Sequence, residues 1–280
     1  MPDVAVVVPS GRGPATAAAC VAAVRQGAAP LDVDVVVVAD GDAWSDPLPA
    51  VVGARLVRSE GAGPGPRHGP CAARNTGIRA TTAPLVVTTD DDVRPRPGWL
   101  PALVAALRNG DAGVGGPVVA HRPSTLLGRF ADWRRPLDAQ LDPARTRYLV
   151  TANSLWRRAA LDQVGLFDES FLAPGGEELE LCDRLLRAGW TLGWAPDAVV
   201  EHEFDVGLRR FVRTNYSYGR GTSLAFARMG RTVQRRRLLR SYAGVALKRA
   251  WRTDPPAFTA VELLAVGARM VGEVRHARRR

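Results

Sequence analysis

The amino-acid sequence predicts an α/β fold built on a mostly parallel β-sheet. Short apolar runs alternate with helix-like segments through the first 119 residues, and two of these runs, residues 4–8 and 33–39, are rich in valine. Such nearly continuous β-branched runs are typical of strands buried on both faces of a sheet. Parallel strands need crossover connections, so the alternation indicates βαβ units with right-handed crossovers.

The elements of this first part follow from local signals. We expect strands at residues 4–8, 33–39, 54–57, 85–89 and 114–119, and helices at residues 14–26, 70–79 and 97–108. Pro14 suits the first turn of a helix, and Gly27 suits its end. The glycine- and proline-rich residues 61–66 are expected to form a loop. Gly77 costs a helix about 1 kcal/mol relative to alanine, so we expect close packing to explain it.

The second part of the chain is less regular. Residues 120–147 contain arginine and tryptophan without clear periodicity and are expected to form a loop or lid. Beyond them we expect strands at residues 148–155 and 198–200, and helices at residues 157–164 and 177–188. After Phe204 the chain becomes helical and basic, with breaks near Gly230 and at Pro255-Pro256.

Composition and charge indicate a globular protein with two unlike parts. Of the 280 residues 46% are hydrophobic, which is enough for a full core. Residues 206–280 hold eighteen basic and three acidic side chains, a net charge of +15, whereas residues 1–205 have a net charge of −5. We therefore expect a main domain at residues 1–205 and a basic helical extension at residues 206–280 that serves as an attachment surface.

The sequence also bears on the cellular compartment. The three cysteines, Cys20, Cys71 and Cys182, lie far apart without metal-ligand spacing, which suits a reducing cytosol. The N-terminus lacks the basic and long apolar regions of a signal peptide, and no stretch reaches the roughly 18 apolar residues of a membrane span. A cytoplasmic location is the expectation.

The most informative feature is the triplet Asp90-Asp91-Asp92, which directly follows the apolar run at residues 85–89. Three adjacent carboxylates repel one another, and a divalent cation bound together with substrate phosphates is the usual counter-charge. On an extended backbone Asp90 and Asp92 point to one side, which suits Mg²⁺ or Mn²⁺, whereas Asp91 points to the other side and is expected to be structural. The alternative is a solvated loop cap.

Other polar groups are expected at the same edge of the sheet, because ligands of parallel sheets bind at the carboxyl ends of the strands. The first strand ends at Pro9-Ser10 and the second at Asp40. Asp40 can accept a hydrogen bond from a base or a ribose hydroxyl, unless it only forms a turn with its glycine neighbour. Arg74, on the helix at residues 70–79, can offer its fork of donors to a base or diphosphate; the alternative is an ordinary surface arginine.

A second acidic cluster, Glu177-Glu178, follows Gly175-Gly176 at the start of a helix. A carboxylate here can deprotonate an attacking hydroxyl if partial burial raises its pKa, although the helix dipole lowers that pKa. The alternative is that these charges only favour the helix N-terminus. His202, after the run at residues 198–200, is a metal ligand, a phosphate contact or a surface histidine.

In their order and spacing these pieces resemble the family 2 glycosyltransferases, which have the GT-A fold. The resemblance runs from Val4 to about Gly221, close to four fifths of the chain. The segments that carry it are residues 4–9, 35–40, 73–77, 89–93, 97–100, 151–153 with Arg158, 164–169, 175–181 and 218–221.

The resemblance implies the GT-A nucleotide-diphospho-sugar transferase fold, with a nucleotide-binding half at residues 1–119 and an acceptor half at residues 120–205. It implies an inverting, metal-dependent transfer of a sugar, most simply from a UDP-type donor, to an acceptor hydroxyl or similar nucleophile. The donor-binding residues would then be Pro9, Ser10, Asp40, Arg74, Asp90 and Asp91, with Asp40 at the uracil-type base.

The same resemblance assigns the metal and the catalytic base. Asp90 and Asp92 form the DxD motif, and Asp92 and His202 would hold Mg²⁺ or Mn²⁺. Glu178 matches the base, with Glu177 before it, although the family usually has Asp at the position of Glu178. The opening loop at residues 10–13 lacks the usual Thr-Tyr-Asn that stacks on the base.

The acceptor is a small molecule, a peptide or a lipid-linked glycan, and we expect Trp133, Asn153 and Trp156 on its side of the site. In the extension a helical pattern of apolar residues, flanked by arginines, either lies on the inner face of an anionic membrane as a peripheral contact or covers the main domain or a partner subunit of an oligomer. That pattern consists of Leu238, Leu239, Tyr242, Val245 and Ala246.

Two other classes compete with this interpretation. A sugar-phosphate nucleotidyltransferase also uses a parallel sheet and paired carboxylates, but it normally carries a glycine-rich phosphate loop with a basic residue, which residues 10–13 imitate only faintly. A nucleic-acid binder would explain the arginine-rich end but would leave both acidic clusters unexplained.

Overall fold

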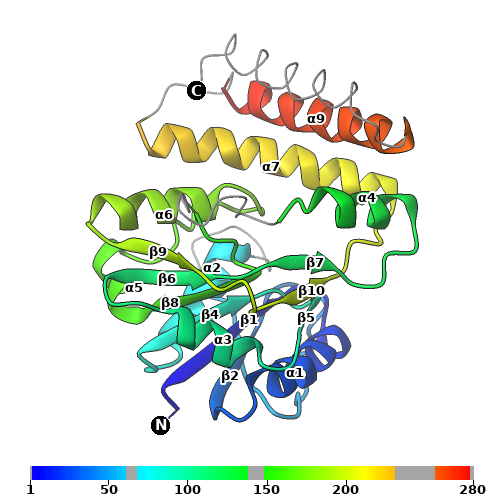
Figure 1. Cartoon of the computed structure of the whole chain (residues 1–280). Helices are drawn as coiled ribbons and strands as arrows, with labels where there is room; N and C mark the ends of the chain where they lie inside the picture. The colour runs from blue at the N-terminus through cyan, green and yellow to red at the C-terminus, as the bar shows by residue number, and fades with distance from the viewer. Residues whose placement is uncertain (1, 61–67, 138–147, 231–255, 278–280) are drawn as a thin grey trace.

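The computed structural model of the chain describes residues 2–60, 68–137, 148–230 and 256–277. Its main sheet has seven strands in the order β3-β2-β1-β4-β8-β6-β9 (Figure 1). These strands are β1 (Val4–Ser10), β2 (Val33–Ala39), β3 (Arg55–Arg58), β4 (Leu85–Thr89), β6 (Asp111–Gly115), β8 (Asn153–Arg157) and β9 (Thr191–Trp194). All neighbours are parallel except β8, which runs antiparallel to both β4 and β6, so the predicted mostly parallel sheet is confirmed.

A second sheet of three strands lies beside the first and carries part of the site. Its order is β5-β10-β7, with β10 antiparallel to β5 and parallel to β7. The strands are β5 (Val93–Pro95), β7 (Val118–Ala120) and β10 (Val200–His202). β5 directly follows the acidic triplet and pairs with β10, so it brings His202 near that triplet.

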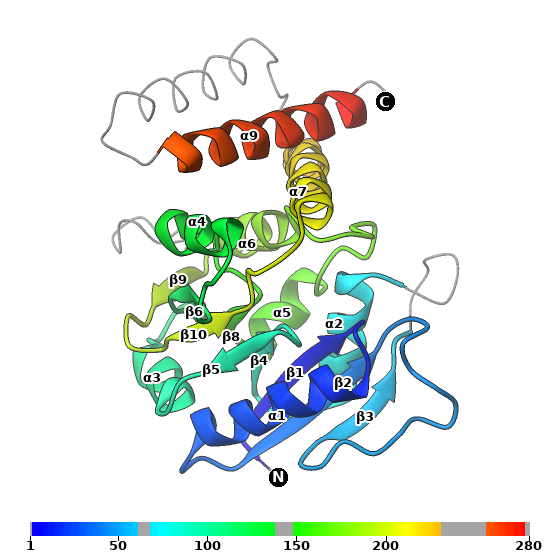
Figure 2. The same cartoon turned by 90° about the vertical axis from the view of Figure 1, so that its right-hand side faces the viewer.

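The helices cover both faces of the main sheet and the edge where the strands end. They are α1 (Pro14–Ala28), α2 (Pro70–Arg79), α3 (Trp99–Ala106), α4 (Leu126–Arg134), α5 (Arg158–Val164), α6 (Glu177–Arg187), α7 (Leu208–Arg228) and α9 (Pro256–Ala277). α7 lies over α4 and α6, and α9 lies on α7 on the side away from the sheet (Figures 1 and 2). The C-terminal helices therefore form a layer of their own.

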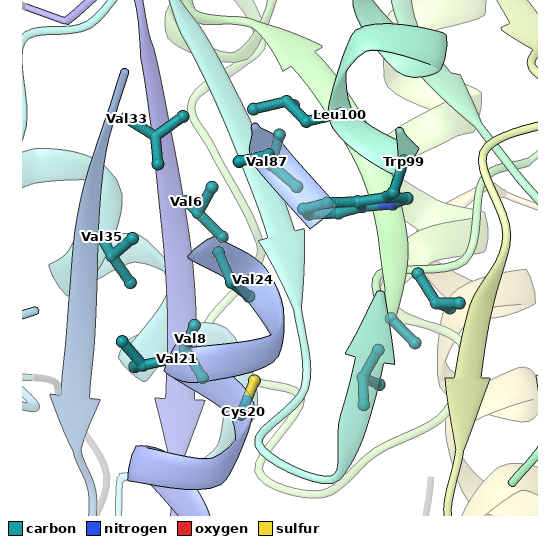
Figure 3. Packing of buried hydrophobic residues seen from close by; sticks show 14 of the residues in the cluster. Val6, Val8, Cys20, Val21, Val24, Val33, Val35, Val87, Trp99 and Leu100 are labelled. Atoms are coloured by element: carbon teal, nitrogen blue, oxygen red, sulfur yellow. The ribbon is translucent and has the colours of Figure 1, made fainter. Parts of the chain in front are cut away.

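The valine runs of β1 and β2 are buried on both faces, as predicted. On one face Val6 and Val35 pack with Val24 of α1 and with Trp99 and Leu100 of α3 in one apolar cluster (Figure 3). The other face is packed by α2 and α5 around a second cluster. Because apolar side chains are needed on both faces, the sequences of these strands are continuous apolar runs and do not alternate between apolar and polar residues.

Gly77 of α2 sits where the helix lies closest to the sheet. A Cβ at this position would lie 2.3 Å from Cγ1 of Val7 and 2.9 Å from Cγ2 of Val38. Both are branched side chains in a packed core, so they cannot move aside cheaply. The close packing predicted for Gly77 is confirmed.

We therefore expect Gly77→Ala to lower the free energy of unfolding by about 1–3 kcal/mol, the usual cost of overpacking a core. Gly267→Ala is the matched control, because in α9 no described atom lies within 4 Å of the added Cβ. The control should be neutral or stabilising by up to about 1 kcal/mol. Urea denaturation of both variants measures the difference; equal stabilities would contradict close packing at Gly77.

Two of the strands predicted from the sequence are wrong in their bounds. The expected strand at residues 114–119 is divided at Gly116-Pro117 into β6 and β7, which belong to different sheets. The expected strand at residues 148–155 begins only at Asn153.

The loop or lid expected at residues 120–147 contains a helix, α4. Thr125 caps it by accepting a hydrogen bond from the backbone N–H of Gly128 at 3.0 Å. Phe130 is buried, and its ring makes edge-to-face contacts with Phe211 of α7 and Phe258 of α9. The helix is thus stabilised by contacts with residues more than 80 positions away, which local periodicity does not reveal.

The predicted break near Gly230 agrees with the structure, whereas the one at Pro255-Pro256 extends into residues outside the described ones. α7 ends at Arg228, just before Gly230 with a φ of 69°, and α9 begins at Pro256. The apolar residues Leu238, Leu239, Tyr242, Val245 and Ala246, predicted to face a membrane or the protein, lie outside the described residues. Within the described residues no helix combines the length and apolar character needed to span a membrane.

Candidate functional site

A cavity of about 710 Å³ lies at the carboxyl ends of β1, β2 and β4. Pro9, Ser10, Asp40 and the acidic triplet line it from the sheet. α4, α6, α7 and α9 line it from the opposite side, so part of the basic extension forms a wall of the site. Its size is that of a small-molecule site.

Asp90, Asp92 and His202 form a candidate metal site in this cavity. One ligand atom from each lies within 4.8 Å of the others, and Nε2 of His202 is 3.4 Å from Oδ1 of Asp92. The other ring nitrogen of His202, Nδ1, lies 3.0 Å from the carbonyl oxygen of Glu203. If Nδ1 carries the proton and donates to that carbonyl, Nε2 keeps its lone pair for a cation, as in many metal-binding histidines. Two carboxylates and one imidazole are a donor set that fits Mn²⁺.

Asp91 also lines the cavity but does not belong to this cluster. Its Oδ2 accepts a hydrogen bond from the hydroxyl of Ser10 at 2.8 Å and one from the backbone N–H of Arg12 at 3.3 Å. Burial raises the pKa of Asp91, and the hydrogen bond from Ser10 opposes that rise. Asp91 therefore connects the loop after β1 to the end of β4. Ser10 was predicted to bind the donor, and in the structure its hydroxyl makes this contact with Asp91.

Three arginines surround the acidic triplet. Arg74 donates to Oδ1 of Asp90 at 3.1 Å, and the Nε of Arg12 is 3.6 Å from Oδ1 of Asp91. The terminal Nη2 of Arg12 donates to Oδ2 of Asp92, and Arg210 of α7 lies 4.0 Å from the same oxygen. Besides the divalent cation expected from the sequence, the chain itself thus places positive charge beside the triplet.

Arg74 is not the surface arginine of the alternative interpretation. Its side chain is 4% exposed, and its second donor contacts Oε1 of Glu177 at 3.1 Å. The other oxygen of Glu177 accepts a hydrogen bond from the backbone N–H of Gly175 at 2.6 Å. Both oxygens of Glu177 are therefore engaged, and Arg74 links the acidic triplet to the start of α6.

Glu178 lies on the cavity wall next to this network. Burial raises the pKa of Glu178 well above its usual value, and the charge of Glu177 adds to the rise while Arg74 opposes it. The sequence left open whether burial or the helix dipole dominates; in the structure burial does. A carboxylate with a raised pKa is a stronger base, which suits proton abstraction near neutral pH.

The turn before Glu178 is held by α7. A Cβ on Gly176 would lie 2.3 Å from the carbonyl oxygen of Gly221, and one on Gly221 would lie 1.5 Å from that of Gly175. The two backbones are in direct contact, so any larger residue would push α7 away from α6. Tyr218, which also lines the cavity, has its pKa raised by burial and by the charge of Glu178.

A pH dependence of stability follows from the raised pKa of Glu178. The pKa of Glu178 is higher in the folded than in the unfolded protein, so the folded state binds the proton more tightly. The stability that this proton contributes is fully present at acidic pH and is lost as the pH rises through the folded pKa. We expect Glu178→Gln to remove this loss. The melting temperature of the variant should exceed that of the wild type by a few degrees near pH 8 and by less near pH 5, since one pKa unit corresponds to about 1.4 kcal/mol. Calorimetry at both pH values tests this; a constant difference would contradict the raised pKa.

The family model for glycosyl transferase family 2 matches residues 5–165 of the chain, more than half of its length. The chain belongs to the family 2 glycosyltransferases. The predicted resemblance is confirmed, and with it the assignment to a glycosyltransferase family.

Two curated glycosyltransferases are similar to part of this chain. The pre-mycofactocin glycosyltransferase of Mycobacterium tuberculosis is 33% identical over 159 residues, which is 54% of this chain and 33% of that protein. The N-acetylglucosaminyl-diphospho-decaprenol L-rhamnosyltransferase of the same organism is 33% identical over 121 residues, 42% of this chain and 36% of that protein. The chain thus spans about a third of the length of these relatives.

Solved structures confirm the GT-A fold. A mannosyltransferase from Pyrobaculum calidifontis, in complex with GDP-Man and Mn²⁺, gives a TM-score of 0.60 at 18% identity, covering 99% of this chain and 75% of that chain. Glucosyl-3-phosphoglycerate synthase from Mycobacterium tuberculosis, in complex with Mn²⁺, UDP and glucosyl-3-phosphoglycerate, gives 0.56 at 20% identity, covering 83% and 82%.

Asp40 of this glycosyltransferase lies at the end of β2 and is 6% exposed. Its two carboxylate oxygens accept hydrogen bonds from the backbone N–H groups of His68 and Gly69, at 2.8 and 3.2 Å. These bonds hold the start of α2 against β2. Asp40 is therefore more than a turn residue, and it still lines the cavity.

The three residues predicted on the acceptor side are placed elsewhere. Asn153 is 1% exposed. Its amide nitrogen donates to the carbonyl oxygens of Pro117 and Ala198, and its amide oxygen accepts a hydrogen bond from the indole N–H of Trp99. Trp156 is fully buried in the core, where its N–H donates to Thr88. Neither side chain can reach an acceptor, so these two predictions are wrong.

Trp133 is on the surface of the glycosyltransferase, 39% exposed, with its ring 5.6 Å from that of Phe258. Among the described residues that line the cavity, Phe130 and Arg134 of the same helix take the place expected for Trp133. Residues of α4 thus line the cavity, but Trp133 is not among them. Residues 120–147 contained no periodicity from which the lining residues could be predicted.

Several cavity residues were not predicted as site residues from the sequence. They are Arg12, Arg210, Tyr218, Glu262 and Arg269. Arg269 of α9 donates to Oδ1 of Asn215 at 2.9 Å and stacks 5.5 Å from the ring centre of Tyr218. In the sequence, Arg210 and Arg269 contributed only to the overall basic character of the extension.

Proposed function

We propose that this protein is a metal-dependent, inverting glycosyltransferase that moves a sugar from a nucleoside-diphosphate donor to an acceptor hydroxyl. The observation that carries the proposal is one cavity of a family 2 fold that holds both the Asp90, Asp92 and His202 cluster and a carboxylate of raised pKa, Glu178. The first group suits a cation on a diphosphate, and the second suits proton removal from an acceptor.

The donor would lie along the carboxyl ends of β1, β2 and β4. Each carboxylate oxygen of Asp40 has two lone pairs and uses one for a backbone N–H, so a further lone pair remains for the N–H of a uracil ring. Ser10, Asp90 and Asp92 would then face the diphosphate. UDP, present in one structural neighbour, is the proposed nucleotide, and GDP, present in another, is the alternative.

Asp90, Asp92 and His202 would hold Mn²⁺ or Mg²⁺, with Mn²⁺ the better fit to an imidazole ligand. When bound, the cation supplies positive charge to the leaving diphosphate oxygens. Arg74 keeps Asp90 oriented and fixes Glu177 at the start of α6. Glu178 takes the acceptor proton while the acceptor oxygen attacks the anomeric carbon in line with the leaving group.

The proposed function is tested by thermal-shift measurements with nucleoside diphosphates and sugar nucleotides, each with Mn²⁺ and with Mg²⁺. A UDP-sugar that raises the melting temperature only with a divalent cation supports the donor and metal assignments. For a donor that binds, the anomeric configuration of the product, read by proton NMR, tests inversion. A product that retains the donor configuration would contradict the in-line mechanism.

Nucleotidyl transfer remains the alternative reaction. It would release pyrophosphate from a nucleoside triphosphate, whereas glycosyl transfer releases a nucleoside diphosphate. Family membership favours glycosyl transfer. Pyrophosphate release with UTP and a sugar phosphate, with no turnover of any sugar nucleotide, would reverse that preference.

A further inference from the structure

The acidic triplet is already matched by cationic side chains. Asp90 pairs with Arg74, Asp91 lies 3.6 Å from Nε of Arg12, and Asp92 contacts Nη2 of the same arginine. Arg210 adds a fourth contact at 4.0 Å. Each carboxylate of the triplet therefore already has an arginine partner, although Arg74 is shared with Glu177.

Arg12 is the arginine in direct competition with a cation. It contacts Oδ2 of Asp92, while Oδ1 of Asp92 faces Nε2 of His202 in the candidate metal site. A divalent cation on Asp92 would thus lie beside a guanidinium group attached to the same carboxylate. The cation and the guanidinium group would repel each other because both would contact one carboxylate. The repulsion is strongest where water is partly excluded, and the side chain of Asp92 is only 7% exposed.

An additional anion removes this conflict. The diphosphate of a sugar nucleotide carries several negative charges and can contact both the cation and Arg12. Arg12 lines the cavity and its side chain is 30% exposed, so it has access to a ligand there. Its fork of donors matches phosphate oxygens.

We propose that Arg12 is a diphosphate-binding residue that makes cation binding at Asp92 conditional on the donor diphosphate. The inference rests on the proposed function for the identity of the ligand. Without diphosphate, Arg12 weakens cation binding; with diphosphate, Arg12 and the cation bind the same anion. By linkage, the cation strengthens diphosphate binding by the same factor as the diphosphate strengthens cation binding.

Equilibrium dialysis of the full chain against Mn²⁺, with and without UDP at equal free concentration on both sides, tests the proposal. For the wild type, UDP should strengthen Mn²⁺ binding at least about 10-fold, within the usual range of coupling between sites. Arg12→Ala should bind Mn²⁺ alone about 10-fold more tightly than the wild type and show a smaller effect of UDP, because only the direct contact between diphosphate and cation remains. Arg12→Lys keeps the charge and should bind Mn²⁺ alone as weakly as the wild type.

Arg94→Ala is the matched control. It removes one positive charge from an exposed side chain two residues beyond Asp92, where no contact with the triplet is described. It should leave Mn²⁺ binding and its dependence on UDP unchanged. An equal gain in Mn²⁺ affinity in this variant would attribute the effect to overall charge and overturn the role of Arg12.

The inference and the proposed function fail in different ways. If the wild type retains UDP with Mn²⁺ but Arg12→Ala binds Mn²⁺ no more tightly than the wild type, the role of Arg12 is wrong and the proposed function stands. If no variant retains UDP or GDP, the proposed donor is wrong. In that case tighter binding of Mn²⁺ alone by Arg12→Ala would still support competition at Asp92, and unchanged binding would overturn it.

Discussion

Glu178→Gln is expected to lower kcat by about 10²- to 10⁴-fold, the usual contribution of a general base, while leaving donor binding intact. Glutamine keeps the size of the side chain but cannot take a proton. The donor-side groups are unaffected, because the hydrogen bonds around Asp90 and Arg74 do not include Glu178. Transfer to an acceptor and the binding of UDP with Mn²⁺, measured on the same preparation, separate the two effects.

Two further variants make this result specific. Asp162→Asn neutralises an exposed carboxylate on α5 and should leave kcat unchanged. Glu177→Gln removes a partner of Arg74, so it should lower stability and weaken donor binding as well as slow transfer. Full transfer activity in Glu178→Gln would place the base elsewhere, with Glu177 the first candidate.

Asp92→Ala is expected to weaken metal-dependent donor binding at least about 100-fold, because it removes a proposed cation ligand and not only a residue that orients one. Its neighbour gives the contrast. Asp91→Asn should lower the melting temperature, since it weakens the contact between the loop after β1 and the end of β4. It should nevertheless retain the dependence of donor binding on Mn²⁺.

Titration calorimetry with UDP, at several concentrations of Mn²⁺, measures both variants. If Asp92→Ala binds UDP as tightly as the wild type and with the same dependence on Mn²⁺, the metal assignment is wrong. If Asp91→Asn loses the dependence instead, the proposed roles of the two neighbours are exchanged. A correctly folded Asp92→Ala, shown by an unchanged circular dichroism spectrum, is required for either conclusion.

The first half of the fold could be predicted from sequence because its signals are local. The valine runs of β1 and β2, the proline at the start of α1 and the apolar run before Asp90 each specify their element within a few residues. Alternation of strand and helix then leaves few topologies. α4 could not be predicted in this way, because its apolar residues are matched by α7 and α9 rather than by its own periodicity.

The candidate site, like the fold, could be predicted from the sequence only in part. The acidic residues at the strand ends were recognisable because parallel strands end at one edge, whatever the remaining chain does. The partners of those residues were not recognisable. Asn153 and Trp156 carry polar groups suited to a ligand, yet the core uses them, and only the packing around Trp99 and Thr88 reveals it.

The sequence by itself determined the class of fold, the family and the carboxylates at Asp90, Asp92 and Glu178, since these depend on runs and motifs within short segments. The tertiary structure alone decided which charged groups surround those carboxylates. It brings Arg12, Arg74 and Arg210, from three distant segments, to the acidic triplet, and it partly buries Glu178 beside Glu177. Electrostatic energy depends on distance and burial in space, and neither is encoded in the spacing of residues along the chain.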